Sequence, residues 1–305
     1  MRLSFFKRTI LPGILALAVQ ASEPKKFYKT IGHLQLETER RFGASEGDFL
    51  SLDKIINEAS KSISKININS HQEAIESLQK INGLLKNEGF KADKGGVDFL
   101  FKALRDKKAD CDIFTSIYLS ISQKNDIPLT AVDVPAHFFI RWKLGKSYIN
   151  WETTQGAVFR DEDYENYFRK RLGAYGLGRH PPAFSLEFKE YSPDAFAYWI
   201  IISRNNLGRR AYKKETYNEL KKRNFTALAE YLSAGISSEP LSLERVFLRG
   251  AAYESIGLAS EAMQDYNFAS SFGSKIIEDY MDYFGYLTKE VKLARSAGIK
   301  ERKGL

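Results

Sequence analysis

The sequence predicts an α+β protein with a helical N-terminal region and an all-α C-terminal module of helical repeats. Three observations lead to this fold class. Amphipathic helical stripes precede residue 94, a run of β-branched and aromatic residues from 128 to 153 indicates strands, and the pattern from Ser192 onward is helical. The 305 residues are 43% hydrophobic, which is enough for two or more packed modules and excludes a disordered tail.

Residues 1–21 have the pattern of a secretory signal peptide. Basic residues precede an apolar run that ends in small residues, where a peptidase could cut at Ala18 or Ala21. The run falls short of the roughly 20 apolar residues that span a bilayer, and it contains Pro12 and Gly13. We therefore expect a periplasmic or secreted protein with no membrane attachment after cleavage. An uncleaved membrane anchor is the alternative.

Composition disfavours nucleic acid, metals and cofactors as ligands. The net charge of +8 includes three basic residues of the signal, and the remaining excess is spread along the chain without a basic cluster interleaved with aromatics. The four histidines and the single cysteine lack the spacing of a metal site. No glycine-rich phosphate loop follows a strand. We expect no nucleic-acid partner, no metal and no cofactor.

Residues 22–94 make up the predicted helical N-terminal region. One helix is expected at roughly Leu50 to Ile66, where apolar residues recur at a helical spacing. A second helix follows Ser70, a suitable N-cap, and ends before Gly89. Neither helix contains a recognisable catalytic or binding motif, so both are interpreted as packing elements.

Residues 95–168 form the predicted α+β core. After Gly95 and Gly96 a short helix is expected, and a longer helix begins at Cys111 with Asp110 as its cap. Pro128 breaks that helix, and strands follow. Because Cys111 is the only cysteine, the chain forms no internal disulfide. An exported protein needs such a thiol to be buried or used.

The two strands after Pro128 are expected to form a hairpin. We assign residues 143–146 to a four-residue loop, which pairs Ile140 with Ile149 on an apolar face. On the other face the same register places His137 directly opposite Glu152, close enough for an imidazole–carboxylate hydrogen bond. A slip of one residue would move every side chain to the opposite face, so this inference depends on the loop length.

Cys111, His137 and Glu152 are the candidate catalytic residues. A cysteine hydrolase or acyl transferase needs a thiolate, a base that takes and returns the proton, and an acid that orients the base. The free N–H groups and dipole of a helix start favour a thiolate and can donate to an oxyanion, whereas the carboxylates of Asp110 and Asp112 oppose it. Taken singly, the three also have ordinary explanations as a core thiol, a strand histidine and a strand-end charge.

The order of a helix-initial cysteine, "VPAHFFIRW" and "YINWETT" resembles the transglutaminase-like superfamily, a branch of the papain-like thiol enzymes. The resemblance covers roughly residues 95–168. It implies Cys111 as nucleophile, His137 as base and Glu152 as orienting acid. Asn150, two positions before Glu152 on the same face, is a candidate secondary polar contributor. The family typically has aspartate where this chain has Glu152. Some relatives have lost the triad and serve as binding modules.

The rest of the chain is divided into a linker at residues 169–191, rich in glycine and proline, and helical repeats at 192–305. Small and aromatic residues resemble a tetratricopeptide repeat at Gly250, Tyr253, Gly257, Ala262, Tyr266 and Ala269. A looser upstream copy comprises Leu207, Gly208, Tyr212, Ala227, Tyr231, Ala234 and Pro240. Some bacterial relatives join these two modules.

The leading hypothesis is an exported cysteine-dependent hydrolase or acyl transferase that acts on amide bonds of a peptide or protein through a thioester. The triad favours an enzyme of the peptidase, amidase or transglutaminase-like kind. The alternative is an interaction protein, in which the repeats bind a protein partner and the transglutaminase-like domain is a scaffold.

Overall fold

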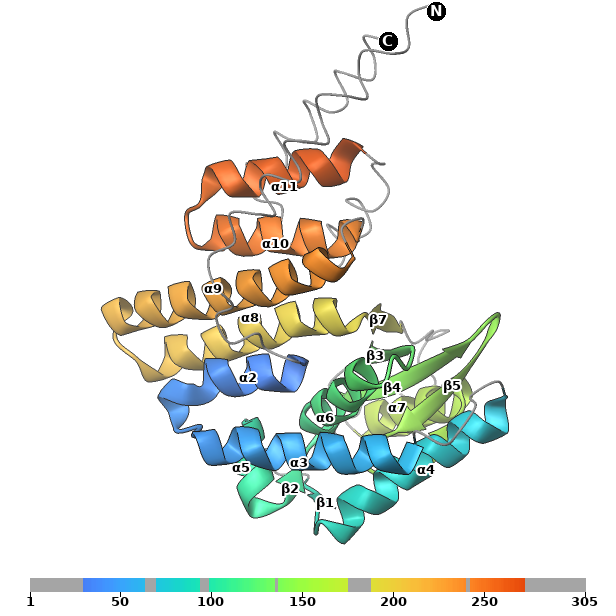
Figure 1. Ribbon diagram of the computed structural model, residues 1–305. Helices are drawn as coiled ribbons and strands as arrows, with labels where there is room; N and C mark the ends of the chain where they lie inside the picture. Colours follow the sequence, from blue (N-terminus) through green and yellow to red (C-terminus); the bar gives the residue numbers. More distant parts are fainter. Residues whose placement is uncertain are drawn as a thin grey trace, which may run out of the picture.

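The computed structural model describes residues 30–63, 70–93, 99–134, 137–174, 188–239 and 242–271 (Figure 1). The fold mixes helices with a small sheet. The N-terminal helices are α2 (Ile31–Glu39), the 3-10 turn η1 (Arg40–Phe42), α3 (Glu46–Ile63), α4 (His71–Asn87), α5 (Leu100–Asp106) and α6 (Cys111–Lys124). The later ones are α7 (Asp161–Ala174), α8 (Pro193–Ala211), α9 (Lys214–Ser238), α10 (Leu243–Ser255) and α11 (Ala259–Ser271). The predicted signal, Gly95 and Gly96, and the chain after Ser271 lie outside the described residues.

Local capping explains where the N-terminal helices begin. Ser70 accepts a hydrogen bond from the backbone N–H of Glu73 at 3.2 Å, which caps α4 as predicted. The helix α3 begins at Glu46, earlier than the expected Leu50, and Asp48 accepts the backbone N–H of Ser45 there. At the start of α6 the Asp110 carboxylate accepts the N–H of Ile113 at 3.3 Å. The predicted start of that helix is confirmed.

Five strands form an antiparallel sheet in the order β6-β5-β4-β3-β7. They are β3 (Leu129–Val134), β4 (His137–Leu144), β5 (Ser147–Glu152), β6 (Ala157–Phe159) and β7 (Lys189–Tyr191). A separate parallel pair joins β1 (Lys91–Ala92) to β2 (Lys108–Ala109) just before α6.

The predicted hairpin register is wrong by two residues. Ile140 pairs with Trp151 rather than with Ile149, because the loop between β4 and β5 has two residues and not four. Gly145 takes φ +62 at the first loop position, a conformation typical of two-residue hairpin turns whose twist matches the strands. A shift of two keeps each side chain on its predicted face, since the side-chain period of a strand is two.

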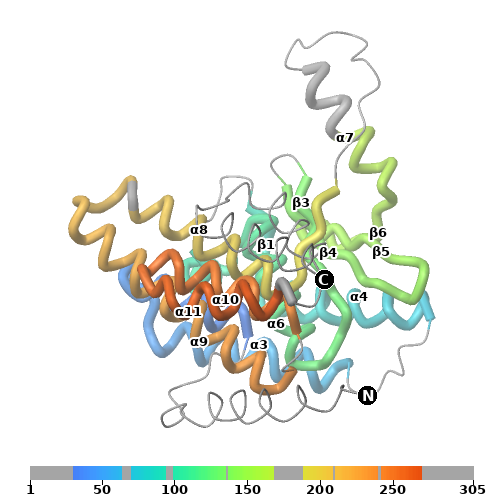
Figure 2. The backbone as a smooth tube through the Cα atoms, turned by 90° about the horizontal axis from the view of Figure 1, so that it is seen from above, coloured from blue at the N-terminus to red at the C-terminus, as the bar shows by residue number. Residues whose placement is uncertain are grey.

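The two faces of the sheet are covered differently. The helices α4, α6 and α8 pack on one face, and its residues Ile140, Trp142 and Trp151 belong to the main hydrophobic core. The other face carries a smaller apolar cluster that includes Phe139 and Tyr164, the latter from α7. Figure 2 shows α7 on the opposite side of the sheet from α8–α11.

The expected linker at residues 169–191 is partly structured. Residues 169–174 belong to α7, and β7 pairs with β3 as an edge strand of the sheet. Residues 175–187 lie outside the described part. A three-residue strand is too short to show alternation in sequence, so the glycine- and proline-rich composition around it dominated the prediction.

A single apolar core joins α2–α6, the sheet and α8–α10. Figure 1 shows α2, α8, α9, α10 and α11 as successive layers. A buried ion pair connects the first two layers, with Arg204 Nε 2.8 Å from Glu39 Oε1. The Glu39 carboxylate also accepts the backbone N–H groups of Leu100 and Phe101, each at 3.1 Å, at the start of α5. The N-terminal region and the C-terminal helices therefore share one interior.

The C-terminal helices cross closely at small residues. A Cβ placed on Gly208 of α8 would lie 2.4 Å from Leu220 of α9, and one on Gly250 of α10 would lie 2.8 Å from Tyr266 of α11. Such contacts are what the expected repeats require, but the tetratricopeptide assignment stays a prediction. Across the described ranges, every helix is too short or too polar to cross a membrane.

Candidate functional site

Cys111 occupies the first turn of α6, at the N-terminal end of the helix that lies against the sheet. Its side chain is half-buried and packs against the main core. The N–H groups at a helix start have no acceptor within the helix, which creates a partial positive charge beside the thiol. Asp110 uses its carboxylate to cap this same helix, as expected from its position. The thiol is thus placed where an anion is stabilised.

His137 and Glu152 meet on the α7 face of the sheet. The His137 Nε2 atom lies 2.6 Å from Glu152 Oε2, with 19% of the histidine side chain and 2% of the glutamate side chain exposed. The predicted hydrogen bond is therefore present, although the strand register differs. Continuing the observed pairing places Glu152 beside Phe139, so the acid approaches His137 diagonally rather than from the directly opposite position.

The His137 imidazole also interacts with the Cys111 thiol. Burial lowers the pKa of His137, but hydrogen bonds and charge interactions with Cys111 and Glu152 outweigh it and raise this pKa to about 9. An imidazole that is held protonated at neutral pH favours an ionised partner on either side. The structure thus brings the three predicted residues together, with the histidine between the cysteine and the carboxylate.

Two residues that sequence reasoning missed hold the Glu152 carboxylate. Thr154 donates to Oε1 from its backbone N–H at 3.0 Å and from its hydroxyl at 2.5 Å. The Tyr164 hydroxyl donates to Oε2 at 3.4 Å. Burial raises the pKa of Glu152, but the bonds from His137 and Thr154 lower it below its ordinary value overall. The carboxylate therefore stays ionised although it is buried.

Tyr164 could not have been found from strand pattern or motif, because it comes from α7. Its ring stacks on Phe139 with centroids 4.1 Å apart and planes 11° apart. Burial raises the pKa of Tyr164, and the neighbouring Glu152 charge raises it further. Thr154 lies only two residues after Glu152, but no motif distinguishes it in the sequence.

Asn150, the predicted secondary polar residue, does not bond to His137. Its Oδ1 accepts from Arg141 Nε at 2.7 Å, and its Nδ2 donates to Asp161 Oδ1 at 2.6 Å. Arg141, which is 6% exposed, also pairs with Asp161 at 2.9 Å and with Glu190 at 2.6 Å. Since Asp161 is the first residue of α7, this network fixes the helix that carries Tyr164.

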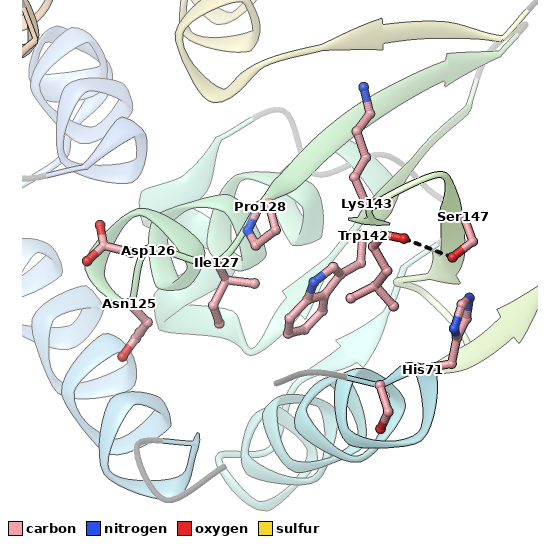
Figure 3. Close-up of a pocket in the computed structure, with 11 residues that line it drawn as sticks. His71, Asn125, Asp126, Ile127, Pro128, Trp142, Lys143 and Ser147 are labelled. Carbon is pink, nitrogen blue, oxygen red and sulfur yellow. Dashed lines mark hydrogen bonds between the residues drawn. The ribbon is translucent and has the colours of Figure 1, made fainter. Parts of the chain in front are cut away.

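A cavity of about 620 Å³ lies at the other end of α6 and β4 (Figure 3). Its lining includes Asn125 and Asp126 after α6, Trp142 of β4 and His71 of α4. A 14-residue helix is about 20 Å long, so α6 separates this cavity from Cys111. The cavity is therefore distinct from the candidate triad. Among the described residues, no cluster of three or more histidine, cysteine or acidic side chains could hold a metal ion.

Comparison with known families identifies one domain in the chain. Residues 49–185 match the family described as the Transglutaminase-like superfamily. The matched region begins inside α3, well before the expected boundary at residue 95, and contains the whole of α6, β3–β6 and α7. No curated protein matches the chain.

Proposed function

We propose that the transglutaminase-like domain at residues 49–185 is a cysteine-dependent hydrolase or acyl transferase that acts on amide bonds. The observation that carries the proposal is the position of His137 between the Cys111 thiol and the Glu152 carboxylate. These are the three functional groups that thiol catalysis needs, and they come from α6, β4 and β5. The family match supports the same class of fold.

The acylation step follows from these positions. The Cys111 thiolate attacks the carbonyl carbon of the amide, and the carbonyl electron pair moves to oxygen. N–H groups at the start of α6 are placed to stabilise that oxyanion. His137, protonated by the thiol, gives its proton to the leaving nitrogen as the C–N bond breaks. An amine departs, and a thioester remains on Cys111.

Deacylation reverses the roles of the same groups. His137, now neutral, takes a proton from the acceptor, whose oxygen or nitrogen attacks the thioester carbonyl. Water gives hydrolysis, and an amine gives a new amide bond. The thiolate leaves and recovers its pairing with the imidazolium. Glu152 stabilises the imidazolium each time it forms, as a buried carboxylate bonded to its ring nitrogen.

We also propose that the chain is exported, that its substrate is a peptide or protein, and that the C-terminal helices bind a protein partner. The apolar run at residues 9–21 supports export. The close helix crossings at Gly208 and Gly250 support a repeat-like stack.

The experiment is alkylation of Cys111 by iodoacetamide, followed by mass spectrometry, at pH 7. As the only cysteine, Cys111 is the only thiol to label. We expect labelling at least about tenfold faster than that of a free thiol peptide, because a protonated His137 can take part in activating the thiol. His137→Ala should remove this advantage. His71→Ala, at an exposed position on α4, is the matched control and should not.

Turnover is tested with a panel of fluorogenic peptide amides, with and without an added primary amine. Cys111→Ser should abolish any release of the fluorophore. Labelling at the ordinary rate in the wild type, unchanged by His137→Ala, would contradict catalysis and favour the scaffold hypothesis.

A further inference from the structure

We infer that Thr154 and Tyr164 are positioning residues that clamp Glu152, and that the register of this hairpin requires glutamate rather than aspartate. The inference rests on the proposed function, because it assigns roles to the surroundings of the same triad.

The first step concerns reach across the hairpin. Since Ile140 pairs with Trp151, Glu152 is two residues away from the position directly opposite His137. Diagonal neighbours on one face lie about 7–8 Å apart, against about 4.5–5.5 Å for directly opposite residues. The two side chains nevertheless meet at 2.6 Å. An aspartate would end about one bond length, roughly 1.5 Å, short of the imidazole.

The second step concerns the freedom of the longer side chain. Glutamate has one more rotatable bond than aspartate, and ordering it costs conformational entropy. A diagonal acid that is not held would spend part of its time turned away from His137. Hydrogen-bond donors that hold the carboxylate in place keep it oriented toward His137 before the reaction begins.

Such donors come from two separate elements. Thr154, in the turn after β5, gives Oε1 both its backbone N–H and its hydroxyl. Tyr164, on α7, gives its hydroxyl to Oε2, the same oxygen that meets His137. The 3.4 Å Tyr164 contact is long for an O–H···O bond, so Tyr164 is the weaker member of the pair. The orientation of the Tyr164 ring is fixed by its stacking on the ring of Phe139.

The rate of Cys111 alkylation by iodoacetamide at pH 7 tests the reach argument. Glu152→Gln removes the charge that supports the imidazolium and should slow labelling about tenfold. Glu152→Asp keeps the charge but cannot reach, so it should slow labelling nearly as much. An aspartate variant that labels at the wild-type rate would overturn the requirement for glutamate.

Substitutions in the clamp use the same assay. Thr154→Val removes only the hydroxyl and should slow labelling about threefold to tenfold, whereas Thr154→Ser keeps the hydroxyl and should restore the rate. Tyr164→Phe keeps the stacked ring and should slow labelling about twofold to threefold. The matched control is Tyr167→Phe on the same helix, at a side chain that is 54% exposed, which should have no effect.

Combining these changes with Glu152→Gln separates positioning from general damage. Neither clamp substitution should slow labelling further once the carboxylate is gone, because both act through it. If Glu152→Gln slows labelling but Thr154→Val and Tyr164→Phe do not, the clamp is wrong and the proposed function stands. If neither Glu152→Gln nor His137→Ala has an effect, the proposed function itself is wrong. Circular dichroism of each variant establishes that it is folded.

Discussion

The hairpin of β4 and β5 presents two faces with opposite characters. On the α6 face, side chains such as Ile140, Trp142 and Trp151 lie in the main hydrophobic core and are almost fully buried. On the α7 face, His137, Arg141 and Glu152 are also largely buried, but each is held by hydrogen bonds or charge. One pair of strands therefore supplies stability from one side and His137 and Glu152 from the other, while Cys111 comes from the start of α6.

The contrast is physical as well as spatial. Apolar burial stabilises in proportion to area and tolerates small movements, whereas buried charges are costly unless each partner is in place. A change on the apolar face should therefore lower the free energy of unfolding with little effect on thiol chemistry in the folded protein. A change on the polar face should alter both.

The largest expected effect is that of Trp151→Ala. This side chain is 1% exposed, and its indole N–H donates to the Tyr118 hydroxyl at 3.1 Å. Its loss should lower the free energy of unfolding by about 3–5 kcal/mol. Urea denaturation followed by circular dichroism measures this. A loss below about 1 kcal/mol would show that the α6 face does not carry the stability assigned to it.

Arg141→Met should have the next largest effect. The substitution keeps much of the apolar stem but leaves Asp161 and Glu190 without the guanidinium between them. Because both acids are partly exposed, we expect a loss of about 2 kcal/mol rather than the full penalty of a buried unpaired charge. Urea denaturation at pH 7 measures it. Equal stability of the variant would contradict an ordered network under α7.

Stability and turnover should both depend on pH through His137 on the polar face. The pKa of His137 is raised from 6.5 to about 9, so its contribution to stability is fully present below pH 6.5 and is lost as the pH rises through about 9. Turnover should fall on the alkaline side near pH 9, when the imidazolium loses its proton. Glu152→Gln should move this fall about one pH unit lower, since it removes a cause that raises the pKa. If turnover of Glu152→Gln falls at the same alkaline pH as that of the wild type, the electrostatic coupling between Glu152 and His137 is contradicted.

The smallest expected effect comes from Gly145→Ala in the hairpin turn. A Cβ there meets no atom within 4 Å, so its only cost is the φ of +62. We expect a loss of about 1 kcal/mol in the free energy of unfolding. Gly83→Ala, at a helical glycine that is also open within 4 Å, is the control and should be neutral or stabilising. Equal responses would argue against the two-residue turn and the register it sets.

Sequence reasoning succeeded where the signal is local. The start of α6 at Cys111 followed from Asp110, and the start of α4 from Ser70, because each cap lies next to the element it begins. The helix α2 lies within the predicted helical region 22–94 but was not assigned as a separate helix, since it is buried on nearly all sides and shows no amphipathic stripe.

Features that depend on distant segments were harder to predict. The pairing of His137 with Glu152 was anticipated, yet by a register that the turn at Gly145 does not adopt. The predicted contact is still present because a register error of two residues leaves each side chain on the same face of the sheet. Tyr164 and the Arg141 network come together only when α7 packs on the sheet, which no pattern in β4 or β5 encodes.

The buried pair between Glu39 and Arg204 has a consequence for how this chain could have been assembled. Burial raises the pKa of Glu39, and Arg204 from α8 is the cation that opposes this. A recombination that exchanged the C-terminal helices would leave Glu39 charged in an apolar interior unless the incoming segment brought its own arginine. Exchanging the C-terminal helices alone should therefore destabilise the fold by removing the cation that pairs with Glu39.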